Sequence, residues 1–439
     1  MITTVLDAAA VAAVAADTVS GCTPPTCRIG LLGLGNVGSA VARHTREDAP
    51  HLAARGFAPL ISTALVRRAS HPRPAAVLVA GLTTDIDAFF AEPVDVIVEA
   101  LGGVDPAYAL VRRALDRGIP VVTANKSLIA AHGDELAQLA RRRATALRFE
   151  ASCIAGVPFL GMFERRPLGA RASGVTAILN GTTNSILTAM ASGATFDAAL
   201  ADAQRLGFAE PDPTLDISGA DAAEKLTILI RLFGRLLVDP AALAREGIGS
   251  IEPGDIAAAA EFDGAIRPVA QASWHGRAVQ AFVGPAFVGG THPLARVNGV
   301  TNGIVIVPER RGQGVQCFTG PGAGPDVTAA TLLDDVAELM TERRVLTPSP
   351  ETSEPAASIT RPHSAWFVRL GGAARESDVA DLLGSYGIWT TRLARRGDRT
   401  YVLTCSASHG RIQIALDALQ AATGHATVAL PTVLEEAAC

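Results

Sequence analysis

Short apolar runs alternate with amphipathic stretches through the first third of this chain. The first run starts at residue 26 and stops before Gly33, and the spacing of apolar residues after it predicts a helix from Asn36. Strands consistent with this pattern are predicted at 59–66, 94–103 and 119–126. Strands and helices that alternate in this way predict βαβ units, and therefore a parallel sheet.

The middle of the chain replaces this repeat by a strand, a small polar turn and a helix across 174–187. An acidic loop then leads into a second helix across 207–234, for which Ser218 is the expected N-cap residue. Asp221 and Lys225 stand four residues apart and therefore share one face of that helix. The same spacing is common in exposed salt bridges on solvated helices.

The surroundings of Lys225 favour a binding site over an exposed salt bridge. The helix is strongly apolar after this lysine, and Glu210, Asp212 and Asp216 precede it closely. Burying charge is costly unless the charge is paired, so this much negative charge around one lysine indicates that a cationic group is bound here.

A third pattern follows the segment 344–363, which is rich in Pro, Ser and Thr and is predicted to be a linker. Beyond it, the segment 364–439 has the pattern strand, helix, two strands, helix and strand. The predicted order of elements is therefore βαββαβ.

Composition indicates a globular protein of two or three domains, since the chain has 439 residues. A net charge of −5 offers no basic field for nucleic acid or for an anionic membrane surface. The Ala-rich extension 1–25 is too short and too weakly apolar to span a bilayer, and we expect a helix or a loose tail. The six dispersed cysteines predict free thiols in a reduced, cytoplasmic protein, with a Cys22–Cys27 pair as the alternative.

Lysine provides only two of the 38 basic residues, Lys126 and Lys225. A GC-rich genome that turned lysines into arginines would leave the survivors scattered on solvated faces. Instead, Lys126 ends a strand-like run and Lys225 lies in an apolar helix. Because a lysine can transfer a proton and an arginine holds its proton at physiological pH, both lysines are candidates for proton transfer.

Three glycines form a GxGxxG pattern between the first predicted strand and the first predicted helix. Gly33 permits a tight turn, Gly35 lets backbone approach a pyrophosphate, and Gly38 lets the helix pack closely on the strand. The start of the helix, at Asn36 and Val37, supplies N–H donors to the phosphates. Because the motif follows a strand and opens a helix, it predicts a dinucleotide site.

The second predicted strand ends at Arg67 and Arg68, where NAD-binding proteins carry an acid that holds the ribose hydroxyls. Arginines suit a 2′-phosphate, so the sequence favours NADP over NAD. The alternative is a solvated arginine pair, with Arg73 or no residue at the adenosine ribose. Residues at the carboxyl ends of the later strands, where such sheets bind ligands, are Gly102, Gly103, Asn125 and Lys126.

At these residues the sequence resembles homoserine dehydrogenase. The motifs GLGNVG, TANK, EASCIAGVP, ILNGTTN and GADAAEKL occur in the family's order and spacing, followed by GDI at 254–256 and GPGAG at 320–324. The resemblance covers roughly the first 340 residues, and several of its motifs are more specific than the glycine pattern.

The resemblance implies an α/β protein. A Rossmann-type NAD(P)-binding domain would cover 26–150 and be completed by 320–343, and an α+β catalytic and dimerisation domain would cover 151–319. The implied activity is the NAD(P)-dependent interconversion of L-homoserine and L-aspartate 4-semialdehyde, in threonine, methionine and isoleucine biosynthesis. A homodimer or homotetramer is implied, and we expect no nucleic-acid or membrane partner.

The resemblance also implies roles for individual residues. Lys126 and Lys225 would flank the reacting hydroxyl, with Asp221 orienting Lys225, and the sequence does not decide which lysine moves the proton. Oxidation of an alcohol needs such a base because the hydroxyl proton leaves as hydride passes to the nicotinamide. The residues implied to bind the substrate are Glu210 and Asp216, at its ammonium group, together with Gly181 and Thr182.

The family also holds a monovalent cation, sodium or potassium, through backbone carbonyls. By position, this implies Glu150, Cys153, Ala155 and Val157 as ligands here. A plain Gly-Val-Pro turn is the alternative interpretation.

Departures from the family pattern motivate two other hypotheses. Ser185 stands where the family usually has an aromatic residue, and Phe208 where it often has a tyrosine. These two residues motivate the alternative hypothesis of a paralogous NAD(P)-dependent dehydrogenase acting on a related amino-acid alcohol or semialdehyde. The segment 364–439 resembles an ACT domain, an amino-acid-sensing module often appended to bacterial homoserine dehydrogenases. The string GGAARES stands where an Asp and a Gly usually help to hold the effector. A non-catalytic regulatory protein is therefore the third hypothesis, and the retention of both lysines argues against it.

Overall fold

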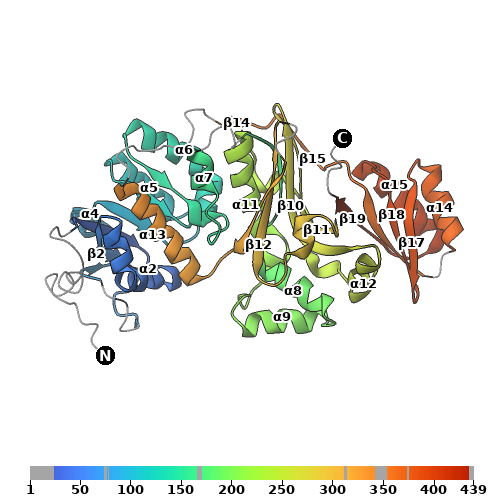
Figure 1. Cartoon of the computed structure of the whole chain (residues 1–439), viewed down its shortest axis with the longest axis horizontal. Helices are drawn as coiled ribbons and strands as arrows, with labels where there is room; N and C mark the ends of the chain where they lie inside the picture. The colour runs from blue at the N-terminus through green and yellow to red at the C-terminus, as the bar shows by residue number, and fades with distance from the viewer. Residues whose placement is uncertain are drawn as a thin grey trace. The chain divides into compact units, whose positions relative to one another are not determined.

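The computed structural model describes residues 24–73, 77, 79–165, 171–310, 314–341, 353–372 and 375–434. The chain forms two compact units, the first from 1–168 and 323–353 and the second from 169–322 and 354–439 (Figure 1). The predicted helix or tail at the N-terminus, the Cys22–Cys27 pair and 344–352 of the predicted linker fall outside the described residues.

The first unit is built on a sheet of six described strands in the order β3-β2-β1-β4-β5-β6, all parallel. The predicted parallel sheet is therefore confirmed. The strands are β1 (Thr26–Leu32), β2 (Ala58–Leu65), β3 (Leu82–Thr83), β4 (Val96–Glu99), β5 (Val121–Thr123) and β6 (Leu147–Arg148). The helices between them are α2 (Asn36–Glu47), α3 (Ala49–Ala54), α4 (Ile86–Ala91), α5 (Ala107–Asp116) and α6 (Lys126–Arg142).

Two strands of this sheet are shorter than predicted, and β4 covers only Val96–Glu99 of the predicted 94–103. The predicted strand at 119–126 ends at Thr123, and Lys126 is instead the first residue of α6. The side chain of Asn125 accepts a hydrogen bond from the N–H of Leu128 at 3.0 Å, which caps the helix and fixes where it starts.

A helix that lies in sequence between the two stretches of the second unit completes the core of the first unit. Helix α13 (Pro325–Thr341) packs beside α2 (Figure 1). Its apolar face contributes Leu332, Leu333 and Val336 to the cluster that also holds Ile29 of β1 and Val41 of α2. A short turn η1 (Glu150–Ser152) and helix α7 (Leu160–Arg165) complete the described elements of this unit.

The second unit contains a mixed sheet in the order β13-β12-β7-β10-β11-β19-β16-β18-β17, with β9 and β15 also paired to β11. The strands of its first half are β7 (Ala172–Ile178), β9 (Ala244–Arg245), β10 (Gly264–His275), β11 (Ala278–Gly289), β12 (Thr301–Pro308) and β13 (Gln316–Pro321). The helices that accompany them are α8 (Gly181–Ala191), α9 (Phe196–Arg205), α10 (Thr214–Ile217), α11 (Ala220–Leu229) and α12 (Pro253–Glu261).

The acidic loop folds differently from its prediction. Ser218 was expected to be the N-cap residue of the lysine-bearing helix, but it is the C-cap residue of the short helix α10. Gly219 is the N-cap of α11, with φ of 77°, a left-handed conformation that glycine adopts without steric cost. The acidic residues that precede Gly219 are therefore partly helical, and α11 begins at Ala220.

The C-terminal segment has the predicted βαββαβ order. Its elements are β16 (Trp366–Gly371), α14 (Glu376–Ser385), β17 (Thr390–Arg396), β18 (Arg399–Thr404), α15 (His409–Thr423) and β19 (Thr427–Val433). Two short strands lie within the predicted linker: β14 (Glu354–Pro355) pairs with β8 (Leu236–Leu237), and β15 (Ser358–Thr360) pairs with β11.

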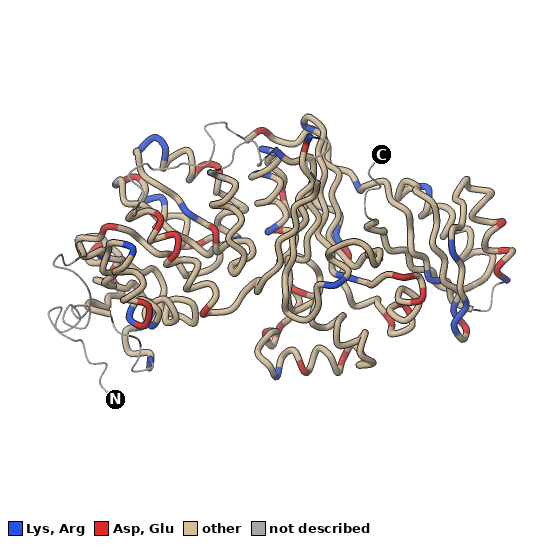
Figure 2. The backbone as a smooth tube through the Cα atoms, viewed as in Figure 1, with Lys and Arg blue, Asp and Glu red and all other residues tan. Residues whose placement is uncertain are grey.

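Charged residues are spread over both units, with basic and acidic positions intermixed along the backbone (Figure 2). Among the described residues, no helix is both long and apolar enough to cross a membrane. The four cysteines in these residues are free: Cys27, Cys153, Cys317 and Cys405.

Candidate active site

The glycine-rich turn of the first unit is shaped by close backbone contacts. Gly33 has φ of 94°, and a Cβ atom there would lie 2.8 Å from the carbonyl oxygen of Ala100. A Cβ atom on Gly38 would overlap the carbonyl oxygen of Gly33, whereas Gly35 faces open space. Helix α2 has no side-chain cap at its N-terminus, so the first N–H groups, at Asn36 and Val37, remain available to an anion.

A pocket of about 360 Å³ lies beside this turn. The first turns of α2 line it, together with Arg43, His71, Arg73 and Asp326. Arg73 is folded back on its own loop, since it donates to the carbonyls of Ala69, His71 and Arg68. Arg67 and Arg68, the predicted 2′-phosphate ligands, are exposed and do not line the pocket.

The carboxyl ends of β4 and β5 are joined by hydrogen bonds. Gly102 and Gly103 follow β4 with φ of 75° and 70°. The Asn125 amide donates to the carbonyl of Gly103 at 2.6 Å and to the buried carboxylate of Glu99 at 3.3 Å. Lys126 is half-buried and begins α6 immediately after Asn125, so this network also fixes the start of α6.

The four residues expected to hold a monovalent cation are all buried, and the segment that carries them packs against α13. The carbonyl of Ala155 accepts a hydrogen bond from the hydroxyl of Thr331, and the carbonyl of Val157 accepts one from the N–H of Phe159 at 2.9 Å. Cys153 is 1% exposed. The Glu150 carboxylate accepts from the N–H groups of Leu160 and Gly161 at 2.9 and 2.7 Å.

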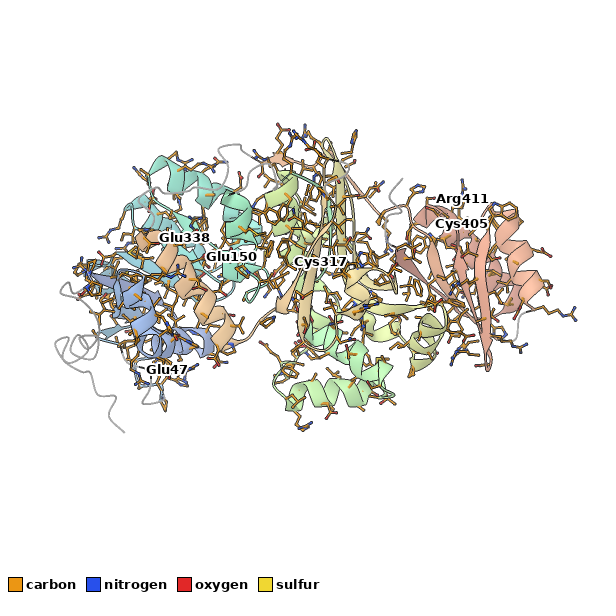
Figure 3. All side chains as sticks on the ribbon, in the orientation of Figure 1. Glu47, Glu150, Cys317, Glu338, Cys405 and Arg411 are labelled. Carbon is orange, nitrogen blue, oxygen red and sulfur yellow. The ribbon has the colours of Figure 1, made fainter. Side chains whose placement is uncertain are left out.

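Other acidic residues lie near this segment, and Figure 3 labels two acids of this region, Glu150 and Glu338. Burial raises the pKa of Glu150, and the nearby Glu338 raises it further. Burial and the charge of Glu150 likewise raise the pKa of Asp335 well above its usual range. Arg148 is the nearby cation, with its guanidinium 3.7 Å from Glu338.

In the second unit, Asn180 joins the elements that carry the predicted substrate site. It follows β7, and its side-chain oxygen accepts from the N–H of Thr183, which caps α8. Its side-chain nitrogen donates to Asp216 at 2.7 Å and to Asp221 at 2.9 Å. One amide therefore holds the start of α8 against α10 and α11.

Lys225 is buried in the same network. Its ammonium group lies 3.0 Å from the Asp221 carboxylate and donates to the carbonyl of Leu179 at 2.8 Å. The lysine side chain is 9% exposed and the Asp221 side chain 13%. This pair is therefore a buried ion pair beside the N-terminus of α8, and the exposed salt bridge considered from the spacing is excluded.

Of the remaining predicted substrate residues, Gly181 and Thr182 lie at the start of α8 and Glu210 is exposed. Gly181 and Thr182 form the first turn of α8, and the Thr182 hydroxyl donates to the carbonyl of Phe208 at 2.6 Å. Glu210 is exposed, and its carboxylate has no hydrogen bond or ion pair within the described residues. Ser185 donates to the carbonyl of Thr182 within α8.

Two residues were missed from the sequence as parts of a site, Glu99 and Asn180. Glu99 is the last residue of the apolar strand β4, and Asn180 follows the apolar strand β7. A carboxylate that ends a strand as apolar as VIVE was a usable signal. The bonds from Asn180 to two distant carboxylates depend on the tertiary fold.

Comparison with known proteins covers both units. A family model described as homoserine dehydrogenase, NAD binding domain, matches residues 33–150, and one described as homoserine dehydrogenase matches residues 158–337. The homoserine dehydrogenase of Synechocystis is 36% identical over 351 residues, which cover 77% of this chain and 78% of that protein.

Solved structures give the same result. The crystal structure of a homoserine dehydrogenase from Thiobacillus denitrificans has a TM-score of 0.83 and 28% sequence identity, covering 93% of this chain and 99% of that chain. A hyperthermophilic archaeal homoserine dehydrogenase in complex with NADPH has a TM-score of 0.59 and 28% identity, covering 73% of this chain and 99% of that chain.

Proposed function

The chain belongs to the homoserine dehydrogenase family, whose members are oxidoreductases acting on a CH–OH group, and on that premise we propose which of its residues carry each part of the reaction. The reaction is the interconversion of L-homoserine and L-aspartate 4-semialdehyde with NAD(P), in threonine, methionine and isoleucine biosynthesis. The observation that carries the assignment is the buried Lys225–Asp221 pair beside Asn180.

Lys225 is the proposed proton-transfer group. When homoserine is oxidised, its hydroxyl loses a proton and its terminal carbon loses hydride, so a base must accept the proton. In the reverse direction the ammonium form of the same lysine returns the proton to the developing alkoxide. Asp221, 3.0 Å away, orients the lysine and balances its charge. Lys126 is the second proposed proton-transfer residue.

The amino-acid end of the substrate carries one ammonium and one carboxylate group. We assign the ammonium to Asp216 and Glu210, because Asp216 is adjacent to Asn180 and Glu210 has no partner of its own among the described residues. We assign the carboxylate to the N–H groups of Gly181 and Thr182, because the first N–H groups of a helix have no acceptor within it.

The dinucleotide, which would supply the hydride acceptor, fits the first unit. The turn at Gly33 and Gly38 leaves no room for a side chain, and the uncapped start of α2 presents N–H groups to a pyrophosphate. We propose NADP over NAD, with Arg67 and Arg68 supported by Arg73 at the 2′-phosphate. Gly102 and Gly103 lie at the strand ends where such sheets bind ligands.

A monovalent cation, sodium or potassium, is proposed for the turn at 150–157. The carbonyls of Glu150, Cys153, Ala155 and Val157 would hold it, and each carbonyl oxygen has a second lone pair beyond the one used by a hydrogen bond. Hard oxygen donors of this kind suit a small cation without redox chemistry. The ion would fix the turn against α13 and take no part in proton transfer.

The test of this function is turnover of L-homoserine, followed as NADPH formation from NADP+. Lys225→Arg and Lys126→Arg keep the charge and should each lower kcat by about two or more orders of magnitude, the usual contribution of proton transfer. An exposed conservative change on α9, Arg205→Lys, is the control. Absence of turnover by the wild type with both NADP+ and NAD+ would remove the proposed reaction.

The assignment of Glu210 has its own test. Glu210→Gln removes one charge from the proposed ammonium site, so KM for L-homoserine should rise by about tenfold while the dissociation constant of NADP+ stays unchanged. The exposed Glu309→Gln, just after β12, serves as the control. A change confined to NADP+ binding would place Glu210 in the wrong site.

Assembly and location complete the proposal. We propose a homodimer or homotetramer, which light scattering of the purified protein would identify. The dispersed cysteines are free in the described residues, which supports a reduced, cytoplasmic setting.

A further inference from the structure

A fully buried carboxylate stands at the nucleotide edge of the first sheet. Glu99 is the last residue of β4 and is 0% exposed. It pairs in register with Leu32 at the end of β1 and with Thr123 at the end of β5. The strand order reverses between β1 and β4, so Glu99 lies at the switch point of the sheet, where parallel sheets bind their ligands.

Four donors surround this carboxylate. One oxygen accepts from the N–H of Leu101 at 2.7 Å and from the Asn125 amide at 3.3 Å, and the other accepts from the Thr123 hydroxyl at 2.5 Å. The N–H of Gly102 is the fourth donor. The donors come from the turn after β4, from the last residue of β5 and from the turn after β5, so the carboxylate joins the two strand ends.

The environment of Glu99 suits its ionised form in geometry but not in charge. A carboxylate accepts about four hydrogen bonds, and a proton on either oxygen would displace one of these donors. No Lys, Arg or His is an ion-pair partner of Glu99 within the described residues. Burial accordingly raises the pKa of Glu99, while its hydrogen bonds lower it.

A buried negative charge without a counterion favours a cation nearby. Of the two forms of the cofactor in the reaction proposed above, only the oxidised form brings a positive charge to this edge of the sheet, because the nicotinamide ring is positively charged in NADP+ and neutral in NADPH. We propose that Glu99 is a positioning residue that holds the two cofactor-facing turns together, and that its charge makes the site bind NADP+ more tightly relative to NADPH.

This inference rests on the proposed function, since it requires a nicotinamide dinucleotide at this edge. Two variants test the two parts of the proposal, the role of the charge and the joining of the turns, separately. Glu99→Gln keeps the size of the side chain but removes the charge, whereas Glu99→Asp keeps the charge but shortens its reach to Leu101 and Thr123. Glu92→Gln is the matched control, because it makes the same chemical change at an exposed position just before β4.

The experiment measures the dissociation constants of NADP+ and NADPH separately, by titration of the purified protein without turnover. Glu99→Gln should weaken NADP+ about tenfold more than NADPH, a small part of the Coulomb energy of two nearby charges in a protein interior. Glu99→Asp should weaken both forms to a similar extent and keep their ratio. Glu92→Gln should change neither constant.

Each outcome decides the proposal. Equal weakening of both forms by Glu99→Gln, or no weakening, overturns the role of the charge. If Glu99→Gln does not fold, as judged by thermal unfolding with NADPH present, Thr123→Val takes its place. That variant removes one donor and leaves the charge, so a changed ratio of the two constants in it or in Glu99→Asp overturns the proposal. Failure of the wild type to bind either form would instead refute the proposed function.

Discussion

The two units hold their functional groups in different ways. The first unit shapes its ligand edge with backbone, through the turn at Gly33 and Gly38 and the turn at Gly102 and Gly103, and its buried carboxylate, Glu99, faces donors only. The second unit uses opposite charges: Lys225 is paired to Asp221, and Asn180 connects that pair to Asp216.

This difference predicts different responses to substitution. Where backbone shape makes the site, an added methyl group is harmful and a lost charge matters less. Where an ion pair makes the site, removal of one partner leaves an uncompensated charge in a poorly hydrated place, which costs more than the pair contributes. Charge substitutions in both units and glycine substitutions in the first unit test the comparison.

The largest effect is expected from Asp221→Asn in the second unit. It leaves Lys225 buried beside a neutral amide, so the lysine loses both its orientation and its counterion. We expect kcat to fall by about two orders of magnitude, measured as NADPH formation from L-homoserine. The matched control, Asp202→Asn, breaks an exposed ion pair to Arg205 on α9 and should leave kcat unchanged. Equal small losses in both variants would remove the distinction between the units.

The next effect concerns backbone shape in the first unit. Gly38→Ala places a methyl group against the carbonyl of Gly33, so α2 must shift away from β1. We expect destabilisation of about 1–3 kcal/mol, measured by chemical denaturation, and at least about tenfold weaker NADP+ binding. Gly35→Ala meets open space and should leave the unfolding free energy near that of the wild type, so that any loss it shows is in NADP+ binding alone. Similar stability losses in the two variants would contradict this account of the turn.

A smaller effect should separate the arginines near the pocket. The exposed Arg67→Ala, Arg68→Ala double variant should weaken NADP+ by about three- to tenfold and leave NAD+ nearly unchanged if these side chains hold the 2′-phosphate. Arg73→Ala is the informative companion, because Arg73 lines the pocket and also holds the loop that carries the other two. Parallel losses of NADP+ and NAD+ in the double variant would assign the 2′-phosphate to Arg73 or to no arginine.

The smallest effect is a pH dependence of stability in the second unit. Burial raises the pKa of Asp255 to about 6, although Arg369 lies beside it. The folded state holds the proton on Asp255 more tightly than the unfolded state does. Protonation of Asp255 therefore stabilises the folded state at pH 4, and this stabilisation is lost as the pH rises through 6. Asp255→Asn cannot titrate, so the difference in unfolding free energy between wild type and variant should change by about 1 kcal/mol between pH 5 and 7. Denaturant titrations at several pH values measure it, and a constant difference would contradict the raised pKa.

The sequence could predict the features that depend on neighbours along the chain. The GxGxxG turn, the parallel strands and the shared face of Asp221 and Lys225 all follow from local spacing. The cap at Ser218 failed because Gly219 can adopt a left-handed conformation, which lets α10 end and α11 begin within two residues. Local preference allowed both arrangements, and the tertiary fold selected one.

Features that depend on contacts between distant segments could not be predicted. Asn180 reaches two carboxylates more than thirty residues away, and Glu99 collects donors from two separate turns. Hydrophobic periodicity indicates which face of an element is buried, but it does not indicate which polar groups of distant segments contact that element in the fold. The buried Arg369–Asp255 pair, between β16 and α12, is a further case.

That pair bears on how the C-terminal βαββαβ segment relates to the rest of its unit. The ring of Phe367 stacks on Phe287 with centroids 5.6 Å apart, and Tyr401 joins the same core as Ile256 of α12. Cutting the chain before residue 364 would therefore expose apolar surface and strand a carboxylate without its guanidinium. The C-terminal segment of this chain is therefore a structural part of its unit, and its removal would change the stability of the residues that remain.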